Sequence, residues 1–172
     1  GVCTVVLASS IWINPVAKGV PEITKSETMQ QIRDLVKEDP QAIWLVVDMA
    51  YPATNIPAMA GADCLNTTQT YPQKTRWEML DQEGEYEDIY NRYCHIRASL
   101  GSKTMLELVS TDYVEVTLSP EELKKLNIRY IVSTNDFDEK IAAGITNIFT
   151  DSGIEFQKYY EGAQLSIFRC VY

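Results

Sequence analysis

An uninterrupted apolar run, IWLVV at residues 43–47, most constrains what this chain can fold into. The run does not alternate between apolar and polar residues, so a strand formed there would be buried on both faces. Such strands occupy the middle of parallel sheets that helices cover. Strand and helix patterns alternate through most of the remaining chain. The sequence therefore predicts an α/β fold with a mixed, mostly parallel sheet sandwiched by helices and a C-terminal antiparallel hairpin.

Two helices carry clear start signals. Before the apolar run, one apolar face is formed at helical spacing by Met29, Ile32, Leu35 and Val36. Ser26 alone, or Thr24 with Glu27, can cap the start of that helix, and Asp39-Pro40 ends it. The second signal is SPEE at residues 119–122, which places a serine cap, a proline at the first helical position and a glutamate at the third.

Further elements are predicted from periodicity and from turn residues. Helices are expected at about residues 72–80, at residues 86–96 on the spacing of Tyr86, Ile89, Tyr90 and Tyr93, and from Asp136 along Ile141, Ile145, Ile148 and Phe149 to a stop at Gly153. Strands are expected at residues 2–8, twice within 105–118 with a turn near 110–112, and at 128–132. Loops or irregular structure are expected at residues 14–21 and 51–70, and residues 154–160 and 164–171 are expected to form the antiparallel hairpin.

Length and charge set the broad class of the protein. A chain of 172 residues, 45% of them hydrophobic and 23% charged, fits one globular domain over residues 1–172. The net charge of −9 and the absence of a lysine- or arginine-rich stripe argue against nucleic acid as a partner. The chain begins at Gly1 rather than methionine, and we expect it to be a fragment of a longer protein.

The residues that usually carry metal or nucleophilic chemistry are sparse. The four cysteines are far apart in the sequence, so we expect buried free thiols and no metal site. The single histidine, His95, is expected near the end of the 86–96 helix in a structural role. No glycine-rich phosphate loop and no serine nucleophile motif occurs. We therefore expect no catalytic residue and no cofactor in this segment.

An acidic cluster leaves an enzymatic alternative open. It consists of Asp81, Glu83, Glu85, Glu87 and Asp88. Its spacing does not match a calcium loop. A pair of carboxylates could serve a glycoside hydrolase, but the sequence does not give their separation. A solvated approach to the following helix is the simpler interpretation.

Aromatic residues gather near the acidic cluster. A sugar site uses flat rings with amide and guanidinium donors beside them, and this combination occurs at Tyr71, Trp77, Tyr90, Asn91 and Arg92. These five residues are the candidate ligand-binding set. The helical spacing of the tyrosines equally suits core packing, and Asp88 and Arg92 can form an i, i+4 pair. Both interpretations stay open from the sequence alone.

Several short segments together resemble a known group of proteins. They are Asn14-Pro15 with Lys18-Gly19, Trp44-Leu45-Val46, Gly61 with Leu65-Asn66, Tyr71-Pro72, Trp77, Tyr90-Asn91-Arg92-Tyr93, and the stretch from Leu118-Ser119-Pro120 through residues 126–133. Their order is similar to the C-terminal extracytoplasmic domain of multi-spanning bacterial membrane proteins, the GT-C-type glycosyltransferase-like and YfhO-like proteins. The resemblance covers nearly the whole chain.

The resemblance implies a location, partners and a function. The parent protein would transfer sugars from polyprenyl-phosphate carriers onto cell-envelope polymers, with its catalytic acids outside this segment. The segment would then be a non-catalytic accessory domain on the extracytoplasmic face of the bacterial membrane. Its partners would be the membrane-spanning part of the parent and a cell-envelope glycan or lipid-linked sugar. A protein–protein interaction module is the alternative function, and a stand-alone glycoside hydrolase is a third.

Overall fold

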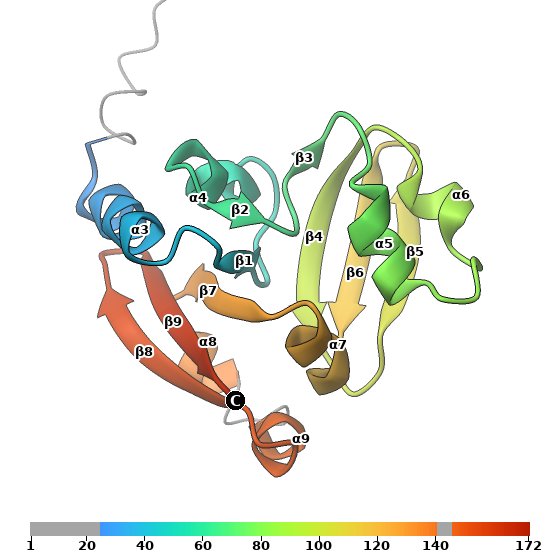
Figure 1. The fold of residues 1–172 in the computed structure, drawn as a ribbon. Helices are drawn as coiled ribbons and strands as arrows, with labels where there is room; N and C mark the ends of the chain where they lie inside the picture. Colours follow the sequence, from blue (N-terminus) through green and yellow to red (C-terminus); the bar gives the residue numbers. More distant parts are fainter. Residues whose placement is uncertain (1–24, 141–145) are drawn as a thin grey trace, which may run out of the picture.

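The computed structural model describes residues 25–140 and 146–172, which form two β-sheets with short helices around them (Figure 1). The helices are α3 (Glu27–Glu38), the 3-10 helix η1 (Ala53–Asn55), α4 (Ile56–Met59), α5 (Lys74–Leu80), α6 (Glu87–Tyr90), α7 (Pro120–Lys125), α8 (Phe137–Lys140) and α9 (Thr146–Asp151). The strands are β1 (Ile43–Val46), β2 (Asp63–Cys64), β3 (Thr68–Gln69), β4 (Cys94–Leu100), β5 (Met105–Ser110), β6 (Tyr113–Leu118), β7 (Ile128–Thr134), β8 (Glu155–Glu161) and β9 (Leu165–Val171).

The prediction of one mostly parallel sheet is wrong. The strands form a five-stranded sheet in the order β2-β1-β7-β9-β8 and a four-stranded sheet in the order β3-β4-β6-β5. Among the named strand pairs, β1–β2, β1–β7 and β4–β6 are parallel, and the others are antiparallel. The apolar run at 43–47 did indicate a central parallel strand. Tight connections make β5–β6 and β8–β9 antiparallel, and β3–β4 and β7–β9 are antiparallel through longer connections.

Most local predictions at element ends are confirmed. The Ser26 hydroxyl accepts a hydrogen bond from the Met29 amide at 3.2 Å, and α3 ends where Asp39 follows it. The predicted strand pair within 105–118 is β5 and β6, and the predicted C-terminal hairpin is β8 and β9. The start of α7 at Pro120 is confirmed, but the Ser119 hydroxyl donates to the Glu122 carboxylate instead of capping a backbone amide.

The predicted helix at residues 86–96 is largely wrong. Only α6 is helical there, and β4 begins at Cys94. Along β4 the side chains alternate between buried and half-buried, with Cys94, Ile96, Ala98 and Leu100 facing the core. The spacing of the tyrosines before Cys94 gave the helical signal, although the residues after it follow the period of two that a half-buried strand requires.

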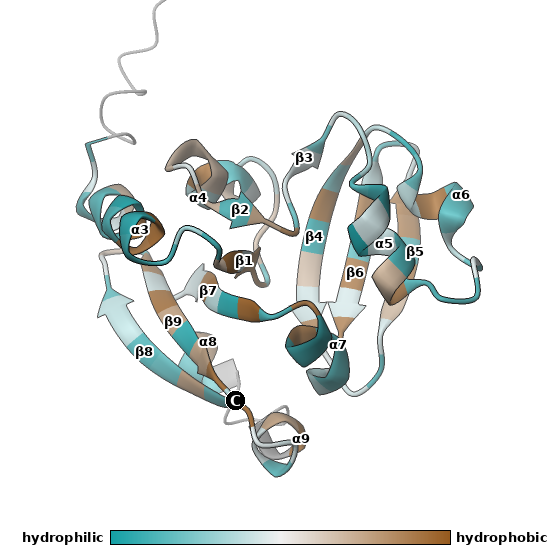
Figure 2. Cartoon of the chain, viewed as in Figure 1, coloured by the Kyte–Doolittle hydropathy of each residue, from teal (hydrophilic) through white to brown (hydrophobic). Residues whose placement is uncertain are grey.

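Two apolar clusters hold the described residues together. One lies beneath α3, where Ile32 and Leu35 cover Trp44 and Val46 of β1. The larger one joins the four-stranded sheet to the inner face of the other sheet and to α5 and α7. Figure 2 shows the contrast between the hydrophobic β1 and the largely hydrophilic α3, whose apolar residues are the buried ones.

The two sheets meet at the end of β1. Val47 forms a parallel bridge with Ala98 of β4, and the Asp48 amide donates to the Ala98 carbonyl oxygen at 2.9 Å. Asp48 has a φ of 58°, which turns the chain out of the five-stranded sheet at this point. Backbone hydrogen bonding therefore links the two sheets at this point.

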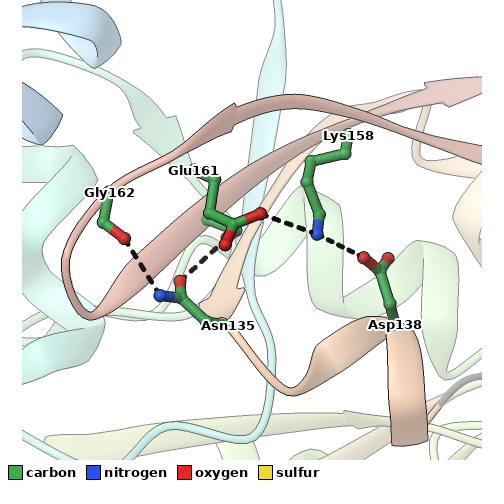
Figure 3. A network of polar contacts seen from close by, with 6 residues as sticks. Asn135, Asp138, Lys158, Glu161 and Gly162 are labelled. Atoms are coloured by element: carbon green, nitrogen blue, oxygen red, sulfur yellow. Dashed lines mark hydrogen bonds and ion pairs between the residues drawn. The ribbon is translucent and has the colours of Figure 1, made fainter.

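The β8–β9 hairpin is attached to its neighbours by polar contacts at its turn (Figure 3). Asn135 donates to the Gly162 carbonyl oxygen at 2.9 Å and accepts from the Ser166 hydroxyl at 2.8 Å. Figure 3 also shows the Lys158 ammonium between the carboxylates of Asp138 and Glu161. A Cβ at Gly162 would lie 2.7 Å from the Thr28 hydroxyl, so the glycine allows the turn to approach α3.

Some predictions fall outside the described residues. These are the strand at 2–8, the loop at 14–21, Thr24, and the apolar positions Ile141 and Ile145. Phe149, from the same predicted stripe, is fully buried in α9, and Gly153 follows that helix with a φ of 75°. Within residues 25–140 and 146–172, no helix is both long enough and apolar enough to cross a bilayer.

Candidate functional site: an aromatic face around His95

Two of the five candidate ligand-binding residues are core residues. Trp77 of α5 and Tyr90 of α6 are only 1% and 3% exposed, and their rings stack with centroids 5.7 Å apart. The Trp77 indole N–H donates to the side-chain oxygen of Gln69 at 2.6 Å. Their proximity therefore comes from packing between α5, α6 and β3.

Gln69 organises this cluster and was missed by the sequence analysis, because residues 51–70 were expected to be irregular. Its side-chain amide group donates to the carbonyl oxygens of Tyr90 at 2.8 Å and Arg92 at 3.2 Å. The buried amide thus ties β3 to the end of α6 and the start of β4. A polar side chain in this position stabilises the structure because all its groups find partners.

The remaining candidates are nearer the surface. Asn91 is exposed and follows α6, and Arg92 donates to the backbone carbonyl of Asp88 rather than to its carboxylate. Tyr71 is 85% exposed, two residues after the end of β3. Tyr71 lines a surface cavity of about 250 Å³. Ligand binding by any of the five residues stays a prediction.

The acidic cluster contains a carboxylate with a structural role. Asp81 is 6% exposed, and its two oxygens accept from the backbone amides of Glu85 at 2.8 Å and Tyr86 at 2.9 Å. The carboxylate therefore holds the loop that leads into α6. The other acids of the cluster are exposed. Both oxygens of Asp81 are occupied by backbone amides, as in a loop-capping carboxylate.

The outer face of the four-stranded sheet carries a different arrangement, centred on His95. His95 of β4 lies opposite Thr68 of β3 in the antiparallel register, so both side chains project from the same face. The Tyr51 ring lies against the imidazole at a centroid distance of 4.2 Å and an interplanar angle of 35°. The Tyr93 ring meets the imidazole edge-on at 5.6 Å and 75°. Aromatic contacts of this geometry contribute about 0.5–1.5 kcal/mol each.

Hydrogen bonds fix the imidazole orientation. Asn55 is bonded to Thr68 twice, since its amide nitrogen donates to the Thr68 hydroxyl at 3.0 Å and its oxygen accepts from the Thr68 amide at 2.9 Å. The Thr68 hydroxyl lies 3.0 Å from His95 Nδ1. Because this hydroxyl already accepts from Asn55, its own proton is available to Nδ1. In the neutral tautomer that accepts this proton at Nδ1, His95 carries its own proton on Nε2 and can donate to a ligand.

We call Tyr51, Tyr93, Thr68 and His95 the aromatic face. Tyr51 and Tyr93 are 52% and 50% exposed, so each ring is in contact with the imidazole and still has accessible surface. A cavity of about 250 Å³ lies beside Thr68, and its lining also includes Tyr71 and the core-facing Ile96. The face thus offers flat apolar surface with hydroxyl and imidazole groups at its rim.

The groups on this face are aromatic rings, a hydroxyl and an imidazole. Among the contacts of the described residues, His95 has no carboxylate partner of the kind that orients a catalytic base. Nor do the described ranges bring together three histidine, cysteine or acidic side chains in a way that could hold a metal ion. Rings held at fixed angles beside hydrogen-bonding groups suit the binding of a ligand with both apolar and hydroxyl surfaces.

The sequence did contain a signal for this site. Alternation from Cys94 to Leu100 places His95 on the exposed side of a strand, and Tyr93 is two residues before it. The contributions of Tyr51 and Asn55 come from the predicted irregular segment and depend on tertiary packing. The positions of these two residues could therefore not be predicted from their sequence neighbours.

Comparison with known proteins gives a family assignment. No curated protein and no solved structure matches the chain. One family model matches residues 22–172, which is most of the chain. The chain therefore belongs to the family described as a domain of unknown function, DUF7654.

Proposed function

We propose that this chain is a non-catalytic recognition domain that binds a glycan on the aromatic face. In the whole protein it is an accessory domain on the extracytoplasmic side of the membrane, attached to a glycosyltransferase-like membrane portion. It assists recognition of the acceptor glycan or the lipid-linked sugar. The resemblance described above supports the setting, and the geometry around His95 supports the binding role.

The observation that carries the proposal is the pair of half-exposed tyrosine rings held against His95. A pyranose ring has a C–H face that packs on an aromatic ring and hydroxyl groups at its edge that need hydrogen-bond partners. Tyr51 and Tyr93 provide the first kind of contact. The Nε2 group of His95 and the tyrosine hydroxyls provide the second.

A specific observation also favours the alternative, a protein–protein interaction module. Strand β5 is an edge strand of the four-stranded sheet, and Met105, Leu108 and Val109 are 49%, 38% and 54% exposed there. Apolar side chains on an unpaired edge are a usual feature of protein interaction surfaces. In this alternative the partner is the membrane portion of the parent, and deletion of the domain would disturb assembly.

The test is titration calorimetry of the chain with a panel of neutral oligosaccharides, such as tetramers of N-acetylglucosamine, glucose and mannose. The double variant Tyr51→Ala, Tyr93→Ala should weaken binding about tenfold or more, which corresponds to the loss of two ring contacts. Tyr159→Ala on β8 is the matched control, because Tyr159 is 49% exposed and far along the chain from His95.

Two results would count against the proposal. One is the absence of heat and of any chemical-shift change with every oligosaccharide of the panel. The other is equal weakening by the control and by the double variant. The alternative is tested by co-purification of the domain with the membrane portion of the parent protein. If the alternative holds, Leu108→Glu should reduce the amount that co-purifies.

A further inference from the structure

Two arginines converge at the end of the five-stranded sheet, away from the aromatic face. Arg169 of β9 lies opposite Tyr130 of β7 and opposite Gln157 of β8, so these three side chains form one row on one face of the sheet. Arg129 precedes Tyr130 on β7. Arg129, Gln157 and Arg169 line a cavity of about 470 Å³ together with residues 170–172.

The guanidinium groups retain much of their hydrogen-bonding capacity. Within residues 25–140 and 146–172, Arg169 has no carboxylate within 4.0 Å and no side-chain hydrogen bond. Arg129 lies 3.6 Å from the Asp39 carboxylate, which is longer than a good charge-assisted hydrogen bond. Each arginine has five N–H donors, so most of them are available to a ligand.

Both positive charges reach the same region. Burial raises the pKa of Tyr130, and the charges of Arg169 and Arg129 oppose that rise. Burial likewise raises the pKa of Cys170 to about 12, against the charge of Arg129. The two guanidinium groups therefore act on one small region of the sheet.

The local charge contrasts with that of the whole chain. The net charge is −9, but the cavity lining contains two arginines and no aspartate or glutamate. In a chain of net negative charge, the two arginines make this cavity locally more positive, although the carboxylates of Asp39 and Glu38 act on the neighbouring Tyr130. The broad negative charge disfavours an anionic membrane or a nucleic acid as the occupant, because both present many charges over a wide area.

We propose that this cavity binds the phosphate group of a phosphorylated small molecule, with Arg129 and Arg169 on the phosphate oxygens and the Gln157 amide as a further donor. Two guanidinium groups match a dianionic tetrahedral group, for which their planar forks give paired hydrogen bonds. The volume exceeds what a phosphate ion needs and lies within the range of small-molecule sites. The inference is independent of the glycan proposal, because the two sites use different strands.

The experiment is a titration of the full chain followed by NMR chemical shifts and calorimetry. The probes are glucose 6-phosphate, inorganic phosphate, glucose, and vesicles of phosphatidylglycerol. We expect glucose 6-phosphate to bind, inorganic phosphate to bind more weakly at the same residues, and glucose to cause no shift near Arg169. Arg169→Gln and Arg129→Gln should each weaken glucose 6-phosphate binding about tenfold or more.

The matched control is Lys103→Gln, which removes one positive charge from an exposed loop beside a different cavity. It should leave the affinity within about twofold, since exposed charges at a distance are screened. Unfolding curves that match wild type will show that the arginine variants are folded.

Several outcomes would overturn the inference. Equal loss in Lys103→Gln and Arg169→Gln would mean attraction by net charge alone. Equal affinity for inorganic phosphate and glucose 6-phosphate would remove the small-molecule part of the inference. Binding to vesicles without binding to glucose 6-phosphate would mean that the arginines bind a membrane surface and not a phosphorylated small molecule. Tyr51→Ala with Tyr93→Ala should leave phosphate binding unchanged, which separates this test from that of the glycan site.

Discussion

The side-chain amide of Asn66 pairs with both backbone groups of Val46. It accepts from the Val46 amide at 2.8 Å and donates to the Val46 carbonyl oxygen at 2.7 Å. Strand β2 pairs with β1 only as far as Trp44 and Cys64, so Asn66 continues the hydrogen-bond pattern where the neighbouring strand stops. Asn66 is fully buried, and this structural role explains why an asparagine lies within the core.

Replacing Asn66 with alanine should lower the free energy of unfolding by about 2–4 kcal/mol, because two buried backbone groups would lose their partner. The measurement is urea unfolding followed by circular dichroism. Gln82→Ala, which removes an exposed amide, is the control and should change the free energy by less than about 0.5 kcal/mol. Similar values for the two variants would contradict the assigned role of Asn66.

Gln69→Leu should be destabilising by about 2–4 kcal/mol even though it adds apolar surface to the core. It leaves the indole N–H of Trp77 and the carbonyl oxygens of Tyr90 and Arg92 without the partner they have now. Urea unfolding would give the free energy, and tryptophan fluorescence would report a changed Trp77 environment. Gln41→Leu at an exposed position is the comparison, and we expect it to have little effect.

The three described cysteines should be unreactive in the folded protein. Burial raises the pKa of Cys64 to about 12, of Cys94 to about 11 and of Cys170 to about 12, and all three are free thiols. The thiolate is the reactive form, so at pH 8 each should react with an aromatic disulfide reagent far more slowly than after unfolding in guanidinium. A Cys3→Ser background restricts the assay to these three, and rapid labelling of the native protein would show that the thiols are accessible.

Glu122 should give the stability a dependence on pH in the acidic range. Burial alone would raise the pKa of Glu122, but hydrogen bonds from Ser119 and Thr104 outweigh burial and leave the pKa below its usual value. A carboxyl with a lowered folded pKa stabilises the protein above its unfolded pKa, and this contribution is lost as the pH falls through the folded pKa. The free energy of unfolding should therefore fall from about pH 5 downward.

The variant that isolates this effect is Thr104→Val, which removes one of the two hydroxyl donors to Glu122. The decrease between pH 6 and pH 3 should be smaller in Thr104→Val than in wild type. Glu121→Gln removes an exposed neighbouring carboxylate and should leave the slope close to that of wild type. A Thr104→Val slope equal to that of wild type would mean that this hydrogen bond does not set the pKa.

Local signals predicted the elements well where a few adjacent residues determine the outcome. Ser26, Pro120 and Gly153 marked helix ends because capping and backbone conformation depend on neighbours in sequence. The central position of β1 followed from its unbroken apolar character. The second sheet was not foreseen, because β4 was taken as the continuation of a helix and sheet pairing is a long-range property.

The candidate site was less predictable than the fold. Trp77 and Tyr90 share one neighbourhood as expected, but it lies in the core, and whether an aromatic residue is buried depends on what packs above it. His95 was assigned to the end of a helix, so its half-buried position on the outer face of β4 was missed. The rings beside it come from separate segments, and only the assembled sheet brings Tyr51 to His95.

The bridge between Val47 and Ala98 has a consequence for how the molecule can be taken apart. The Asp48 amide donates to the Ala98 carbonyl oxygen, so this backbone hydrogen bond joins one sheet to the other. Separating the sheets would leave these two backbone groups without their present partners. Separately expressed halves, divided between β3 and β4, would each lack strands from the shared region. We expect such halves to be insoluble alone and to regain structure only when they are refolded together.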